Sequence, residues 1–231
     1  MQGARDVVAV NKDLKTVLAA AGRFFAYCLL AAVPVLLLRH DLGVIGNTLG
    51  EDSYVERAQA VFLLASTLSF VALAVRRLED RRFAVLAAAF FACMLIREQD
   101  ALLDGLLFHG AWKYLTTPLA LGALVWAACD WRSTLSGLAR FVSSRAGAVM
   151  VLALVLVLSW SRLFGMTGIW TAVLGDGYVR VVKNVVEETS ELLGYTFILA
   201  ASLRYLSQRV RYVSRERLQA MQARLGTARH L

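Results

Sequence analysis

KNVVEETSELLGY, residues 183–195, places three carboxylates, Glu187, Glu188 and Glu191, in a segment that is otherwise largely apolar. The composition of the whole chain indicates the environment of this segment. Hydrophobic residues make up 58% of the 231 residues and charged residues only 18%, which is more apolar than an ordinary soluble domain. We therefore expect an integral membrane protein. Ionisable groups at membrane depth are costly and normally face a cavity, a partner or an ion, so these glutamates indicate a site.

Several segments approach the roughly 20 apolar residues that a transmembrane helix needs. The sequence lacks the alternating apolar and polar pattern of a membrane barrel, so helices must satisfy the backbone hydrogen bonds. The predicted fold is all-α, a polytopic domain of six transmembrane helices over residues 22–204, preceded by segment 1–21 and followed by a basic helical tail, 205–231. The six predicted spans are residues 22–38, 58–75, 83–103, 114–129, 147–164 and 182–204.

The distribution of charge predicts the orientation of these helices. With the N-terminus inside, the inner segments hold 18 of the 25 Lys and Arg residues, and the outer segments hold 11 of the 17 Asp and Glu residues. Short cytoplasmic loops retain positive charge, so both termini are predicted to be cytoplasmic in a bacterial-type inner membrane. The net charge of +8 does not indicate nucleic-acid binding, because no soluble basic domain of sufficient length is present. We expect the basic tail to contact anionic lipid headgroups, with a regulatory or partner-binding role as the alternative.

Polar residues in the sixth predicted span align on one helix face. Asn184, Glu188, Glu191 and Tyr195 are spaced i, i+4, i+7 and i+11, and Glu187 borders them. Residues at these intervals lie above one another on a helix. With the predicted topology, they point inward from the outer surface.

The third predicted span carries a second polar group at its outer end. Apolar residues recur past Arg97, so we expect this helix to continue towards residue 108. Arg97, Asp100 and Asp104 would then share one face, and Glu98 and His109 a neighbouring one.

The second predicted span opens with a third polar group. Asp52, Glu56 and Gln59 align at i, i+4 and i+7, although Asp52 and its neighbour Glu51 also suit a capping role at a helix N-terminus. All three polar groups fall at the outer ends of their helices. The topology and the spacing thus predict one shared acidic site that opens towards the periplasm.

Clustered carboxylates cannot all ionise in a low dielectric unless something positive accompanies them. A bound divalent metal is the first interpretation: Zn, Mn or Fe if the histidine takes part, and Mg or Ca if it does not. Internal salt bridges are the second, with Arg57, Arg97, Arg162, Arg180 and Lys183 as the available cations. Protonatable carboxylates on a transport path are the third. The predicted metal ligands are Glu56, Glu98, His109, Glu187, Glu188 and Glu191, supported by Gln59, Arg97, Asp100, Asp104, Asn184 and Tyr195.

The same site suits more than one class of function. As an enzyme, a hydrolase for example, the protein would use the metal on a lipid or envelope substrate, with Glu98, Glu188 and Glu191 as candidate catalytic residues and general base. As a transporter or substrate-capture subunit, it would bind a cation, a proton or a cationic small molecule. A structural salt-bridge network in a non-catalytic subunit is the third class. The motifs of P-loop, dinucleotide-binding, serine-hydrolase and zinc-protease families are absent from the sequence, and membrane lipids are the partners expected. Small residues at 86–92 serve packing within a monomer as well as they serve an oligomer.

Overall fold

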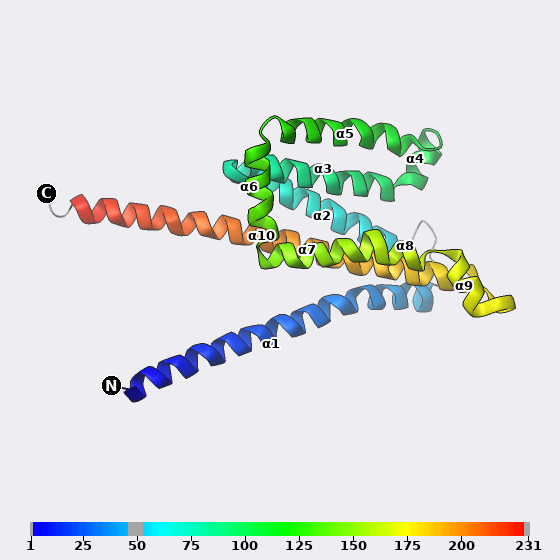
Figure 1. The fold of residues 1–231 in the computed structure, drawn as a ribbon. Helices are drawn as coiled ribbons and strands as arrows, with labels where there is room; N and C mark the ends of the chain where they lie inside the picture. Colours follow the sequence, from blue (N-terminus) through cyan, green and yellow to red (C-terminus); the bar gives the residue numbers. More distant parts are fainter. Residues whose placement is uncertain (1, 46–52, 229–231) are drawn as a thin grey trace.

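Every regular element in the described part of the chain is helical (Figure 1), as the sequence predicts. A computed structural model describes the backbone of residues 2–45 and 53–228, and the side chains of residues 11–43 and 53–211. Its α-helices are α1 (Gln2–His40), α2 (Tyr54–Arg76), α3 (Arg81–Glu98), α4 (Asp100–Leu106), α5 (Ala111–Ala128), α6 (Trp131–Val142), α7 (Arg145–Val155), α8 (Ser161–Phe164), α9 (Thr167–Leu174) and α10 (Arg180–Ala228). Two π-helical turns, η1 (Asp41–Ile45) and η3 (Leu156–Trp160), and two 3-10 turns, η2 (Leu78–Asp80) and η4 (Gly175–Gly177), join some of them.

Among the described helices, three are long and apolar enough to cross a membrane. They cover Asn11–Gly43, Tyr54–Arg76 and Arg145–Phe164, and they include three of the predicted spans. The first is almost entirely unburied within the protein, so its large apolar side chains, such as Phe25 and Leu29, face the surroundings. An exposed apolar surface of this extent indicates contact with lipid. The three helices indicate a membrane protein.

The prediction of six spans is wrong, because the other three segments are helical but carry too much polarity for their length. Helix α3 has 18 residues, and Arg81, Arg82, Arg97 and Glu98 lie at its ends. Helix α5, also of 18 residues, begins with AWKYLTTP, which adds a lysine and two threonines. In α10, only residues 192–203 lie between the last glutamate of the polar face and the next arginine, far fewer than the roughly 20 that a span requires.

The third predicted helix does not continue unbroken towards residue 108. Helix α3 ends at Glu98, Gln99 forms a turn, and the short helix α4 begins at Asp100. Side chains before and after this turn no longer follow one helical repeat, so the predicted alignment of polar residues across the turn is lost.

Helix α10 is the central element of the bundle. It packs against α1, α2 and α7, while α3 packs against α2, α5 and α6. Figure 1 shows α10 running past the bundle as one continuous helix into the predicted basic tail. Aromatic rings fill the core between these helices, and edge-on contacts join Phe70 to Phe83 and Phe141 to Tyr205. Such pairs add to the stability that comes from the burial of apolar area.

The start of α2 is tied to the end of α1 by side chains. Ser53 is the N-cap of α2, and its Oγ accepts a hydrogen bond from the backbone N–H of Glu56. Asp41 is fully buried, and its two carboxylate oxygens accept the N–H groups of Tyr54 and Val55, each at 3.0 Å. These bonds satisfy amides that a helix start leaves unpaired. The capping role predicted for Glu51 and Asp52 falls outside the described residues.

An ionic cluster closes one end of the bundle. The carboxylate of Asp80 is 0% exposed and lies within hydrogen-bond distance of Arg140 of α6, at 2.8 Å, and Arg209 of α10, at 2.7 Å. Glu79 also pairs with Arg77 and Arg209. This Asp80 cluster connects η2, α6 and α10. The starts of α2 and α10 and the ends of α3 and α8 all lie at the opposite end of the bundle, where the predicted acidic site is found.

Candidate functional site

A pocket of about 310 Å³ lies where α2 and α10 begin and α3 and α8 end. Its walls are almost wholly polar, and side chains of both charges line it. We call it the mixed-charge pocket. The described residues that line it are Glu56, Gln59, Arg97, Glu98, Asp100, Arg162, Arg180, Lys183, Asn184, Glu187, Glu188 and Glu191.

The structure brings most of the predicted site residues together here. Glu56 and Gln59 come from the first turns of α2, Arg97 and Glu98 from the last turn of α3, and the remaining acidic residues mainly from α10. Tyr195 lies deeper and donates a hydrogen bond from its hydroxyl to Glu98 Oε1, at 2.8 Å. Segments far apart in the sequence thus contribute to one pocket. The predicted residues located in or next to it are Glu56, Gln59, Arg97, Glu98, Asp100, Asn184, Glu187, Glu188, Glu191 and Tyr195.

His109 and Asp104 lie outside the pocket. The imidazole of His109 is 99% exposed, and its Nδ1 lies 2.6 Å from Asp104 Oδ2. The other oxygen of Asp104 accepts the N–H of Gly110, at 2.8 Å; this bond, with the contact from His109, lowers the pKa of Asp104. Gly110 has a φ of 81°, in the left-handed region that glycine adopts without steric strain. The break at Gln99 explains why the predicted alignment of His109 with Glu98 is wrong.

Arg162 is the main cation inside the pocket. Its guanidinium pairs with Glu191 and lies 3.4 Å from Glu187 Oε1. Lys183 holds the second oxygen of Glu187 at 2.8 Å, four residues earlier on α10. Two cations therefore neutralise two of the glutamates, as the salt-bridge interpretation predicts.

Glu98 and Glu188 have partners other than Arg162 and Lys183. Arg97 Nη1 lies 3.2 Å from Glu98 Oε1, on the neighbouring residue. Gln59 donates its Nε2 to Glu188 Oε2 at 2.9 Å, and no described Lys or Arg forms an ion pair with Glu188. A hydrogen bond from a neutral amide stabilises a carboxylate less than a hydrogen bond from a cation does. Glu188 is therefore a partly buried carboxylate of the pocket that has no ion pair with a described Lys or Arg.

Sequence reasoning missed how the fifth predicted span contributes. The π-helical turn η3 precedes α8 and changes the helical phase. After this turn, α10 is contacted by two side chains of α8, the fully buried Ser161 and the guanidinium of Arg162. Ser161 Oγ lies 2.6 Å from the carbonyl of Val157 and 3.3 Å from Glu191 Oε1. A β-carbon at Gly165 would meet the carboxylate of Glu187. The signal for this contribution in the sequence was Arg162, an arginine near the end of an otherwise apolar predicted span.

The pocket carries more negative than positive groups. Six acidic and four basic side chains line it in the described residues, a formal charge of −2 if all are ionised. Burial raises the pKa of Glu191 to about 8, helped by the charge of Glu98 and opposed by Arg162. Burial likewise raises the pKa of Glu188, against the hydrogen bond from Gln59. A proton or an additional cation is the simplest way to balance this excess.

The carboxylates do not form a metal centre of ordinary geometry. Among the residues that the structure describes, no three His, Cys, Asp or Glu side chains are grouped closely enough to hold a metal ion. The glutamates instead face arginine, lysine, glutamine, serine and tyrosine groups. The grouping of the described side chains therefore gives no support to the divalent metal predicted from the sequence, which stays a prediction.

In the part of the chain that the structure describes, the fold is all-α, with three candidate membrane-spanning helices and a mixed-charge pocket at one end of the bundle. No protein-family model, curated protein or solved structure matches the chain.

Proposed function

We propose that this protein binds a small organic cation, an ammonium compound, in the mixed-charge pocket, as part of transport or substrate capture at a membrane. The excess of carboxylates carries the proposal: six acidic side chains face four basic ones, and Glu188 has only the amide of Gln59 as a described partner. A ligand ammonium group would supply the missing positive charge. Glu188 and Glu191 would hold it by charge-assisted hydrogen bonds.

The size of the pocket favours a molecule over a single ion. A volume of about 310 Å³ lies at the lower end of the range for small-molecule sites. Asn184 and Arg180 line the pocket without a polar side-chain partner among the described residues. They are available to bind an acceptor oxygen of the same ligand.

Arg162 acts in this proposal as an internal competitor for the ligand. It already pairs with Glu191 and is itself 40% exposed, so its guanidinium can move into water when a ligand ammonium group takes its place beside the buried carboxylate. A ligand ammonium group and the arginine would exchange at the same carboxylate.

We infer from the positive-inside rule that the pocket faces the periplasmic side of a bacterial-type inner membrane. The end of the bundle with the Asp80 cluster is rich in arginine, with Arg76, Arg77, Arg81 and Arg82 close together in sequence. The mixed-charge pocket lies at the other end. The proposed pocket is thus open to compounds arriving from outside the cell.

Binding is tested with the purified full-length protein in detergent, using putrescine, choline and ethanolamine as probes in thermal-shift and calorimetric titrations. We expect at least one probe to bind the native protein and to lose tenfold or more of its affinity in Glu188→Gln and Glu191→Gln. Asp176→Asn, an exposed acidic position in η4, is the matched control. Equal affinity in native and Glu188→Gln proteins would contradict the proposal.

The functional class is tested separately in vesicles. Accumulation of the bound probe inside vesicles, abolished in Glu188→Gln, supports transport; binding without accumulation supports substrate capture. Two further measurements test the alternatives. Stoichiometric Zn, Mn, Fe, Mg or Ca in the purified native protein that is lost in Glu188→Gln and Glu191→Gln would favour the metal interpretation. A lipid extract that the protein alters chemically would favour an enzyme.

A further inference from the structure

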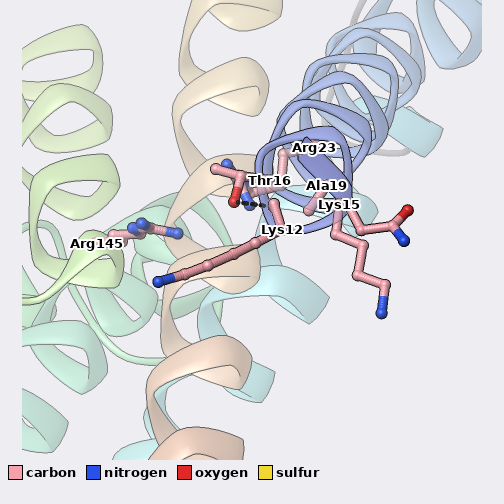
Figure 2. Close-up of a pocket in the computed structure, with 7 residues that line it drawn as sticks. Lys12, Lys15, Thr16, Ala19, Arg23 and Arg145 are labelled. Atoms are coloured by element: carbon pink, nitrogen blue, oxygen red, sulfur yellow. Dashed lines mark hydrogen bonds between the residues drawn. The ribbon is translucent and has the colours of Figure 1, made fainter. Parts of the chain in front are cut away.

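A second cavity, of about 660 Å³, lies between the first half of α1 and the start of α7, and its charged side chains are all cations. Lys12, Lys15 and Arg23 come from α1 at spacings of three and eight residues, and Arg145 is the first residue of α7. Figure 2 shows Lys12 extended from α1 towards Arg145. We call this cavity the basic cleft. Four like charges around one space favour an anion between them.

The cations of the basic cleft are not neutralised by the described protein. Within the side chains described, none of the four forms an ion pair or a side-chain hydrogen bond. This differs from the other end of the bundle, where arginine and lysine pair with glutamates. The positive charge of the basic cleft is thus available to bind an anionic group from outside the described chain.

A separate apolar groove lies one helical turn further along α1 and α7. It is lined by Tyr27 of α1, by Val149 and Leu152 of α7 and by Phe197 of α10, with a volume of about 430 Å³. Tyr27 follows Arg23 by four residues, and Val149 follows Arg145 by four. One helical turn, about 6 Å, therefore separates the charged opening from the apolar groove on each helix.

We propose that the basic cleft and the apolar groove together bind one anionic phospholipid. Its phosphate would lie among Lys12, Lys15, Arg23 and Arg145, and an acyl chain would lie along the groove. The charge of the cleft and the apolar groove one helical turn away favour a lipid, because a soluble anion would use only the cleft. Both helices belong to candidate membrane spans, Asn11–Gly43 and Arg145–Phe164, and basic pockets between such helices suit anionic headgroups.

This site is independent of the proposed cation pocket, which lies at the other end of the bundle. With the orientation predicted by the positive-inside rule, it would face the cytoplasmic leaflet. The bound lipid would fill the gap between α1 and α7, two helices that each contact α10. It would thereby hold α1 against the rest of the bundle.

The test measures phospholipid retention by full-length protein in detergent, with phosphatidylglycerol and phosphatidylcholine as probes, by native mass spectrometry and thermal shift. We expect one phosphatidylglycerol to remain bound in preference to phosphatidylcholine and to raise the melting temperature. Each neutralised cation, in Lys12→Gln, Lys15→Gln and Arg145→Gln, should weaken retention about fivefold, as expected for one basic group near an anionic headgroup. Arg132→Gln, an exposed arginine outside the cleft, is the control and should not change it.

Two further arms separate the parts of the proposal. Leu152→Asn places a polar group in the groove at an exposed position, and it should weaken binding of the long-chain lipid while leaving glycerol phosphate binding unchanged. Equal retention of the two lipids, or equal retention in Arg145→Gln and Arg132→Gln, would overturn the lipid site. Displacement of the lipid by an acidic peptide at matched concentration would overturn it in favour of a protein partner.

Discussion

Arg162 of α8 and Glu191 of α10 form an ion pair in which the guanidinium is 40% exposed and the carboxylate only 4% exposed. The pair joins two segments that are 29 residues apart in sequence, and Ser161 contacts the same carboxylate oxygen. Because the burial is so unequal, losing the arginine has a greater effect than losing the glutamate. A buried charge left without its partner costs more than the pair itself contributes.

Arg162→Gln should therefore destabilise the protein by about 1 to 3 kcal/mol, because Glu191 and Glu187 lose their shared cation. Glu191→Gln should cost less, and the double variant should recover part of the loss, with a coupling energy of about 1 kcal/mol or more. Denaturant unfolding in a fixed detergent measures all four proteins. Strictly additive effects would show that the two side chains do not interact.

The stability of the protein should depend on pH through Glu191. Burial raises the pKa of this carboxyl to about 8 in the folded protein, with Glu98, Glu187 and Glu188 as neighbouring acids and Arg162 as the opposing cation. The folded pKa is above the unfolded value, so the contribution is complete below about pH 4.5 and is lost as the pH rises through about 8. Melting temperatures from pH 5 to pH 9 should fall more steeply in the native protein than in Glu191→Gln. Parallel curves for the two proteins would contradict the assignment.

Asp80 should be essential to the end of the bundle opposite the pocket. Asp80→Asn leaves Arg140 and Arg209 without their buried partner, and we expect a loss of about 2 to 4 kcal/mol. Glu79→Gln is the matched control: the neighbouring carboxylate is 53% exposed and should change stability by less than about 1 kcal/mol. The free energies of unfolding of the two variants are compared. An equal loss of stability in Glu79→Gln and Asp80→Asn would show that the burial of Asp80 does not cause its effect on stability.

Gly194 should be required where α10 packs on α7. A β-carbon there would meet Val157 and the backbone carbonyl of Ala153, so Gly194→Ala must move a helix and should cost about 1 to 3 kcal/mol. Gly122, in α5, has no atom near an added β-carbon. Gly122→Ala should be neutral or stabilising by up to about 1 kcal/mol, because alanine favours helices. Thermal unfolding of both variants tests the difference, and a neutral Gly194→Ala would show that the interface adapts.

Local patterns in the sequence predicted the helices and the polar face of α10. The spacing of Asn184, Glu188, Glu191 and Tyr195 depends only on the helical repeat, so no knowledge of packing was needed to align them. The same reasoning was wrong across Gln99, where a single turn ended the repeat. It also overcounted the spans, because the segments that form α3, α5 and α10 alternate apolar stretches with more charged and polar residues than a membrane span tolerates.

The sequence by itself determined an all-helical, strongly apolar chain in which glutamates gather on one face of its last helix. Only the tertiary structure decided which partner each glutamate has, because Arg162, which pairs with Glu191, and Gln59, which donates to Glu188, come from segments whose exact position relative to α10 no local pattern encodes. The same holds for Asp80, whose two arginines lie 60 and 129 residues away. Helical periodicity is a property of neighbouring residues, whereas compensation of a buried charge depends on long-range packing.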